Sequence, residues 1–107
     1  MASRMTERQL EDHVRTLVRD LGLKGFHVWQ QHAQRADRGF PDWVIAGPHG
    51  QLFRELKRES ESPTPRQEEW LALLAWGGAD AGVWRPSDLI SGRIGEELRA
   101  ISQYRQE

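Results

Sequence analysis

The sequence predicts an α/β domain in which helices flank one mixed β-sheet. Three observations predict it: apolar residues at helical spacing near the N-terminus, two short strands around a Gly-Pro-His-Gly turn, and a strand–helix–strand segment after that turn. A hairpin makes its two strands antiparallel, whereas a strand–helix–strand crossover makes its strands parallel, so the sheet should be mixed. The 107 residues suit one domain over residues 1–107.

The first helix is expected over residues 6–21. Thr6 and Gln9 have the spacing of a capping box, in which each side chain accepts a hydrogen bond from the other residue's backbone amide. The apolar face of this helix consists of Leu10, Val14, Leu17, Val18 and Leu21. Gly22 suits the end of the helix, because glycine readily adopts the left-handed conformation found there.

Three short strands are expected next. Residues 26–30 supply bulky side chains, and residues 42–46 and 51–57 lie on either side of the Gly47-Pro48-His49-Gly50 turn. The polar segment 31–39 between the first two strands is typical of a loop. Because the turn is short, its two flanking strands should pair as an antiparallel hairpin.

The second helix is expected to begin at Pro65. Thr64 caps it, proline suits the first helical position, and Gln67 stands three residues after the cap. Gly77-Gly78 ends this helix, and residues 81–84 follow as a fourth strand.

An amphipathic helix is expected after Pro86. Its apolar residues include Leu89, Ile90, Ile94, Leu98 and Ile101. Gly92 and Gly95 leave open whether this segment is one helix or two. The complete order, α-β-β-β-α-β-α, is that of a sheet with helices on its faces.

Two carboxylates and one ammonium group converge at one end of the predicted hairpin. Glu55 and Lys57 stand two residues apart in a strand, so their side chains share a face. Asp42 begins the partner strand and should lie near them across the hairpin. Taken alone, Asp42 is also suited to capping a turn, and Glu55 with Lys57 to a solvated ion pair.

Asp42 and Glu55 together predict a metal site. Neighbouring carboxylates repel each other unless a proton or a cation lies between them. Such oxygen ligands suit a hard divalent cation, Mg²⁺, and Mn²⁺ is expected to substitute for it. A cation at this position binds a phosphate oxygen and lowers the pKa of a bound water, while Lys57 orients that water or neutralises transition-state charge. The pattern therefore predicts phosphodiester hydrolysis.

Three short motifs carry a resemblance to a known family: Gly39-Phe40-Pro41-Asp42, Glu55-Leu56-Lys57 and Thr64-Pro65-Arg66-Gln67. Together they resemble the PD-(D/E)XK nucleases and, more narrowly, the stand-alone virus-type replication-repair nuclease (VRR-NUC) domains. The resemblance extends from the first helix through Val83-Trp84-Arg85-Pro86. It implies a restriction-endonuclease-like αβββαβ core and a metal-dependent endonuclease acting on DNA. Structure-selective cleavage of flaps or Holliday-junction-like substrates in DNA repair is part of that expectation.

The resemblance also implies roles for individual residues. Asp42 and Glu55 would be metal ligands, helped by the backbone carbonyl of Leu56, with Lys57 as the catalytic lysine. Gln67 would lie beside the site, although it is also suited to completing the cap of its helix and nothing else. Relatives of this type often carry a glutamate on the first helix near the metal. Glu7 is preferred here because it falls within the apolar face of that helix, and Glu11, at the edge of the face, is the alternative.

Four arginines close to the motifs are candidate phosphate contacts, or else solvated loop charges: Arg35, Arg38, Arg58 and Arg66. The formal net charge of −1 gives no strongly basic footprint, which counts mildly against a pure DNA-binding module. Two alternatives to a nuclease are a non-catalytic nucleic-acid-binding module on the same fold, and a partner-binding protein in which the motif is accidental.

The remaining expectations concern partners and compartment. The chain has no cysteine, which excludes disulfides and thiolate metal sites, and it shows no signal peptide or membrane span. We therefore expect a cytoplasmic protein of a bacterial or phage-infected cell, with DNA as its partner, no membrane and no small-molecule cofactor. A chain this small offers little surface for gripping a junction, so a homodimer is expected, with Trp70, Trp76 and the last helix as candidates for its interface.

Overall fold

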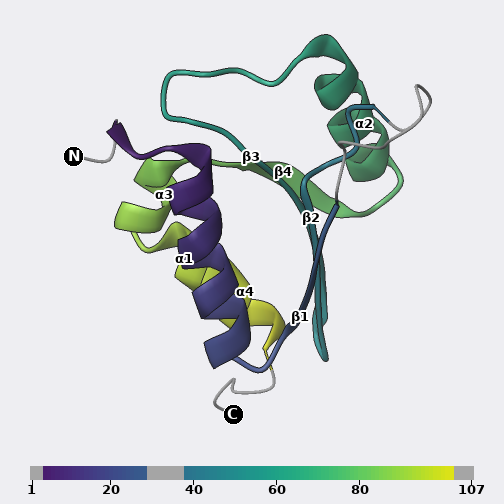
Figure 1. Ribbon diagram of the computed structural model, residues 1–107. Coiled ribbons are helices and arrows are strands. Elements are labelled where there is room, and N and C mark those ends of the chain that lie inside the picture. The colour runs from purple at the N-terminus through teal and green to yellow at the C-terminus, as the bar shows by residue number, and fades with distance from the viewer. Residues whose placement is uncertain (1–3, 29–37, 103–107) are drawn as a thin grey trace.

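The structure is an α/β sandwich built around one mixed sheet (Figure 1). In this computed structural model, residues 4–28 and 38–102 are described, and within them the sheet has four strands in the order β1-β2-β3-β4. β1, β2 and β3 pair antiparallel, and β3 and β4 pair parallel, so the mixed sheet predicted from the sequence is confirmed. The elements are α1 (Glu7–Asp20), β1 (Lys24–His27), β2 (Trp43–Gly47), β3 (Gly50–Leu56), α2 (Pro65–Trp76), β4 (Asp80–Trp84), α3 (Pro86–Ile90) and α4 (Arg93–Ile101).

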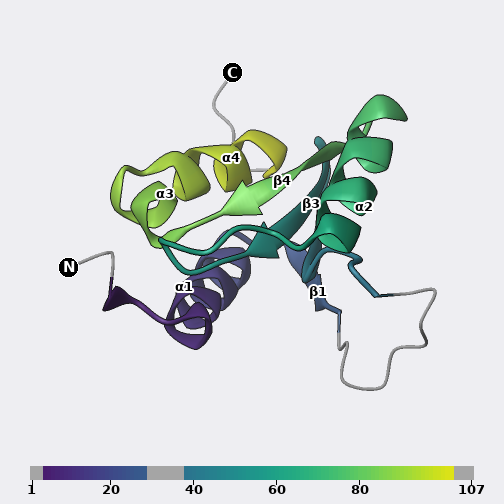
Figure 2. The same ribbon diagram turned by 90° about the horizontal axis from the view of Figure 1, so that it is seen from above.

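The helices lie on both faces of the sheet. α1, α3 and α4 lie against one face and α2 lies against the other, as the view from above shows (Figure 2). The main core fills the α1/α4 side and consists of Leu10, Val14, Val18, Leu23, Trp43, Ile45, Leu52, Leu56, Trp84, Ile94, Leu98 and Ile101. None of the residues of α2 is fully buried. No helix in the described ranges has both the length and the apolar character that crossing a membrane requires.

α1 forms as its sequence predicts. The Thr6 hydroxyl accepts a hydrogen bond from the Gln9 amide at 3.1 Å, and the Gln9 side chain accepts one from the Thr6 amide at 2.9 Å. Both bonds satisfy amides at the start of the helix that have no partner within it. Gly22 follows the helix with a φ of 70°, the left-handed conformation that glycine adopts at low cost.

β1 differs from its predicted bounds. It begins at Lys24, two residues earlier than expected, and residues 29 and 30 of the predicted strand lie outside the described residues. The sequence signal failed at Gly25, which has little strand propensity of its own. Gly25 is nevertheless required, because a Cβ there would lie 2.9 Å from the ring of Trp43, which packs over it. β4 likewise begins one residue earlier than predicted, at Asp80.

The β2–β3 hairpin is tied to the C-terminal helix. Gly47 pairs with Gly50, leaving Pro48 and His49 as the turn between them. The amide of His49 donates to the carbonyl of Ile101 at 3.2 Å, and a Cβ on Gly47 would collide with the same carbonyl. The last amphipathic segment is two helices, α3 and α4, which separate at Gly92 with a φ of 88°.

Candidate active site

The structure brings Asp42, Glu55 and Lys57 together at one end of the hairpin. Asp42 directly precedes β2, and its Oδ2 accepts a hydrogen bond from the Leu56 amide at 2.9 Å. The Nζ of Lys57 lies 3.5 Å from Oε2 of Glu55. Leu56, between them, points to the opposite face and is buried in the core. β3 ends at Leu56, one residue earlier than predicted, and its alternation of side chains, continued by one residue, places Glu55 and Lys57 on the α2 side of the sheet.

Gln67 makes both of the contacts that the sequence left open. Its Oε1 accepts from the Thr64 amide at 2.8 Å, and the Thr64 hydroxyl accepts from the Gln67 amide at 3.2 Å, which completes a capping box. Its Nε2 donates to Oε2 of Glu55 at 2.9 Å. One side chain thus caps α2 and holds the central carboxylate.

The carboxyl group of Glu55 is almost completely buried. Its side chain is 3% exposed, and its Oε1 is one of two buried side-chain polar atoms without a hydrogen-bond partner in the described chain, the other being Trp43 Nε1. Burial, followed by the negative charge of Asp42, raises the pKa of Glu55 to about 8, while Lys57 opposes the shift. Burial also raises the pKa of Asp42, against the lowering effect of the Leu56 amide. Without a cation, Glu55 therefore favours its protonated form near neutral pH.

These features fit a divalent cation. Oε1 of Glu55 has no hydrogen-bond donor among the described residues and is available as an oxygen ligand, and a cation beside Asp42 and Glu55 would stabilise the ionised form of two carboxyl groups whose pKa values burial raises. In the part of the chain that the structure describes, no group of three or more His, Asp or Glu side chains is arranged to hold a metal. Asp42 and Glu55 would be the central ligands, and a backbone carbonyl, water or the neighbouring Glu7 would complete the mixed oxygen shell that suits Mg²⁺.

Glu7 lies at the start of α1, on the border of this site. Partial burial of the carboxyl group and a hydrogen bond with Glu61 raise its pKa, Lys57 lowers it, and the charge of Asp42 raises it further. Glu7 is therefore within electrostatic reach of Asp42 and Lys57, as its predicted role requires. It is an exposed residue and does not complete a three-acid group.

Glu11, the alternative acid on α1, has other contacts. Its Oε2 lies 2.5 Å from the Nη2 of Arg15 and 3.5 Å from the Nδ1 of His27. The Arg15 guanidinium lies over the ring of Trp43, 5.1 Å from its centroid. Glu11 thus belongs to a group of basic and aromatic side chains, and Glu7 remains the better placed of the two acids.

Three of the four candidate phosphate-binding arginines lie beside motif residues in the sequence. Arg38, Arg58 and Arg66 are exposed, and each lies next to a motif residue: Arg38 before Gly39, Arg58 after Lys57 and Arg66 before Gln67. Arg35 lies outside the described residues. A role for these arginines in binding phosphate stays a prediction.

The segment before Asp42 is fixed against the start of α2. Gly39 has a φ of 92°, and a Cβ on it would lie 2.7 Å from the carbonyl carbon of Arg66. Phe40 packs edge-on against Trp70, with ring centroids 4.9 Å apart, and edge-on against Phe53 at 6.3 Å. This close approach sets the position of Asp42 relative to the helix that carries Gln67.

A Gly39→Ala substitution is expected to lower the free energy of unfolding by about 3 kcal/mol, because a left-handed backbone and a steric clash both oppose it. Gly78→Ala is the matched control, since Gly78 has a φ of 99° with no atom within 4 Å of an added Cβ. The free energy of unfolding of that control should fall only by the cost of a left-handed backbone at alanine, about 1–2 kcal/mol. Urea denaturation measures both, and equal losses would show that the approach to Arg66 carries no cost.

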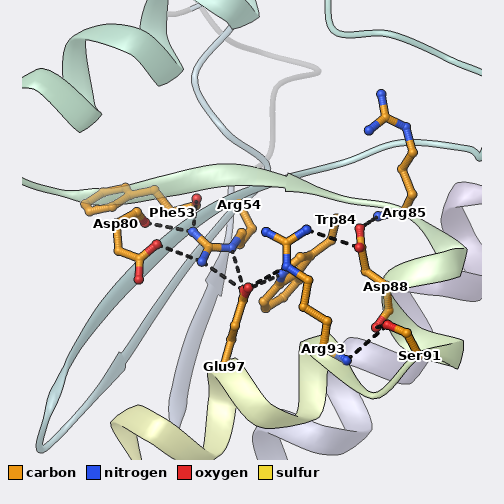
Figure 3. A network of polar contacts seen from close by, with 9 residues as sticks. All are labelled: Phe53, Arg54, Asp80, Trp84, Arg85, Asp88, Ser91, Arg93 and Glu97. Atoms are coloured by element: carbon orange, nitrogen blue, oxygen red, sulfur yellow. Dashed lines mark hydrogen bonds and ion pairs between the residues drawn. The ribbon is translucent and has the colours of Figure 1, made fainter.

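Sequence reasoning missed Arg54, a buried charge on the other face of β3. Its side chain is 3% exposed and joins a polar network with Asp80, Trp84, Arg93 and Glu97 (Figure 3). A signal was available, because Arg54 occupies the same face as Leu52 and Leu56, where the alternation calls for an apolar residue.

Comparison with known proteins gives a likeness in fold. No protein-family model and no curated protein matches the chain. A solved structure described as a VRR_NUC domain protein is similar, with a TM-score of 0.66 and 22% sequence identity over 92% of this chain and 97% of that one. The chain therefore has the restriction-endonuclease-like α/β fold, in the form seen in a VRR-NUC domain, as the sequence motifs led us to expect.

Proposed function

We propose that the protein is a divalent-metal-dependent nuclease that hydrolyses DNA phosphodiester bonds. The observation that carries this proposal is the buried carboxyl of Glu55, which has one unpaired oxygen and lies beside Asp42 and Lys57. A buried acid with this arrangement favours a cation, and a lysine next to it supplies a further positive charge for a phosphate. The likeness in fold to a VRR_NUC domain protein supports the same class of activity.

Asp42 and Glu55 would hold Mg²⁺, or Mn²⁺ in its place, with the Leu56 carbonyl and Glu7 as further ligands. When bound, the metal would supply Lewis acidity towards a phosphate oxygen and a bound water of lowered pKa. Lys57 would orient the attacking water or neutralise charge on the phosphate in the transition state. Gln67 would hold Oε2 of Glu55 by a hydrogen bond, which leaves Oε1 to bind the metal.

DNA is the proposed substrate, with flaps and four-way junctions as the forms to test first. DNA repair in the cytoplasm of a bacterial or phage-infected cell is the setting we propose. A non-catalytic nucleic-acid-binding module on the same fold is the alternative function. The nuclease is favoured over it because Asp42, Glu55 and Lys57 are all present and brought together.

The decisive experiment is cleavage of a labelled panel of single-stranded, duplex, flap and four-way-junction DNA. Mg²⁺, Mn²⁺ and EDTA reactions run in parallel, and the Lys57→Ala variant is the inactive control. We expect cleavage that needs the metal and that disappears in Lys57→Ala, because the variant keeps both carboxylates but loses the ammonium group. Equal cleavage by wild type and variant would indicate a contaminating nuclease.

Absence of cleavage from every member of the panel would favour the binding module. Calorimetric titration of Mg²⁺ and electrophoretic mobility shifts with the same DNA then separate the alternatives. DNA binding without metal binding would support the module. If the protein binds neither DNA nor metal, the result would support a domain whose motif is accidental.

We also propose a homodimer that forms through the outer face of α2. Trp76 is 83% exposed and Leu73 is 53% exposed, although both are large apolar residues. The two side chains stand three residues apart on α2 and so are neighbours on its surface, and a contiguous exposed apolar patch that contains an aromatic residue is typical of a protein–protein interface. Two copies related by a two-fold axis would present two candidate active sites to one junction.

The Leu73→Ser/Trp76→Ser variant is expected to be monomeric at concentrations where the wild type is dimeric, because it removes both exposed anchors. Light scattering coupled to size-exclusion chromatography measures the mass. Phe26→Ser, at a residue 67% exposed on β1 and outside the candidate interface segments, is the matched control and should stay dimeric. A wild type that is monomeric throughout would refute the dimer without touching the proposed chemistry.

A further inference from the structure

A buried ionic network lies on the face of β3 opposite Glu55. Arg54 Nη1 donates to the carbonyls of Phe53 and Asp80 at 3.0 and 2.8 Å, and Nη2 donates to Oδ1 of Asp80 at 2.8 Å. Figure 3 shows these bonds converging on the Arg54 guanidinium. The side chain is 3% exposed, so each of these bonds replaces water that burial removed.

Glu97, on α4, links this arginine to Trp84. Its Oε1 accepts from Nη2 of Arg54 at 2.9 Å and from Nε1 of Trp84 at 2.8 Å. The Arg54 guanidinium also lies over the indole ring, 5.2 Å from its centroid. Arg93 contacts the outer oxygen of the same carboxylate, with its Nε 2.6 Å from Oε2. The indole is therefore held at its edge by Glu97 and at its face by Arg54.

Trp84 connects this network to the candidate active site. It is the last residue of β4, pairs with Leu56 and is completely buried. Its carbonyl accepts a hydrogen bond from the amide of Lys57 at 3.1 Å, just beyond the end of β3. Trp84 thus contacts the network through its side chain and holds the backbone of Lys57 through its carbonyl.

Stability alone gives a weak reason for burying these charges. Replacing a buried ion pair with apolar residues of similar size is often neutral or stabilising, because desolvation offsets the attraction between the charges. The network instead fixes the orientation of the Trp84 indole. Several bonds of fixed geometry allow one orientation of this ring, whereas an apolar contact allows several.

We propose that Arg54 and Glu97 are positioning residues, which hold Lys57 in place through Trp84. This inference rests on the proposed nuclease function for its consequence in catalysis. The network on the α4 side of the sheet would thus keep a residue of the candidate active site, on the α2 side, in a fixed position. Arg93 is outside this role, because its side chain is half exposed, contacts only the outer oxygen of the Glu97 carboxylate and otherwise bonds Asp88.

The test is the Arg54→Met/Glu97→Gln double variant. It removes both charges at once, fills the space of the arginine and keeps an amide oxygen as acceptor for Trp84, so that no buried charge is left unpaired. We expect kcat for DNA cleavage to fall about tenfold with KM unchanged, the scale of losing one charged hydrogen bond. We also expect the Lys57 amide to exchange its hydrogen about tenfold faster.

Two controls separate positioning from general stability. The amide of Leu23, which donates to the Val18 carbonyl at 3.0 Å, lies outside the network and should keep its exchange rate. Arg93→Ala should leave both kcat and the Lys57 amide unchanged. An equal increase at Leu23 and Lys57, or an unchanged Lys57 amide, would overturn the inference. If the wild type cleaves no DNA, the nuclease proposal fails, and the ratio of the two exchange rates still decides whether the network holds Lys57.

Discussion

The Glu55→Gln variant is expected to cleave DNA at least about 10³-fold more slowly than the wild type at saturating Mg²⁺, a loss of roughly 4 kcal/mol of transition-state stabilisation. Glutamine matches the shape of glutamate and can keep the contact with Gln67, but it is neutral and a poor ligand for a hard cation. The expected loss therefore comes from the missing charge rather than from a change in packing. Single-turnover cleavage of the preferred DNA measures it.

Glu69→Gln is the matched control for this substitution. It removes one carboxylate from an exposed position on α2, two residues beyond Gln67, and should cleave at the wild-type rate. Circular dichroism should show that both variants are folded. Near-wild-type cleavage by Glu55→Gln would remove this residue from the proposed chemistry, whatever the result for Lys57→Ala.

The second large effect concerns pH and stability without metal. The folded protein holds a proton on Glu55 up to about pH 8, whereas the group releases it near 4.5 when unperturbed. Between these values the native state binds more protons than the unfolded chain, so stability falls as pH rises. We expect the free energy of unfolding to be highest below pH 4.5, as far as this group is concerned, and to fall by on the order of 4 kcal/mol by pH 8.

Mg²⁺ should reverse this loss, because a bound cation takes the place of the proton. At pH 8 and a concentration one hundred times its Kd, Mg²⁺ would raise the free energy of unfolding by roughly 2.7 kcal/mol. Urea denaturation from pH 5 to 8, with EDTA and with Mg²⁺, measures both effects. Glu55→Gln should flatten the pH profile and remove the response to Mg²⁺. A wild type with equal stability at both pH values would contradict the buried-acid interpretation of this site.

Most of the fold could be predicted from the sequence because its signals are local. Capping residues marked the start of α1 and α2, glycines marked the ends of these helices, and the short turn around Pro48 and His49 fixed the hairpin. β1 was placed two residues late because its Gly25 is explained only by Trp43, a residue distant in the chain. Tertiary contact, rather than propensity, decides such a position.

The candidate site shows the same division. Spacing along one strand placed Glu55 and Lys57 on a common face, and hairpin pairing brought Asp42 to them. The sequence could not show whether Gln67 caps α2, contacts Glu55 or does both, because local sequence does not determine the angle between α2 and the sheet. Arg54 interrupts the apolar alternation of β3, but its partners Asp80 and Glu97 lie far along the chain, so local sequence could not show what pairs with its charge.

The double bonding of Gln67 means that one thermal fluctuation affects two parts of the molecule. Helix ends fray more readily than helix centres, and fraying at the start of α2 would break the bonds between Gln67 and Thr64. The same side chain would then leave Oε2 of Glu55, so a fluctuation of the helix becomes a change in the freedom of a buried carboxylate. The strength of a helix cap therefore sets how often this acid can reorient.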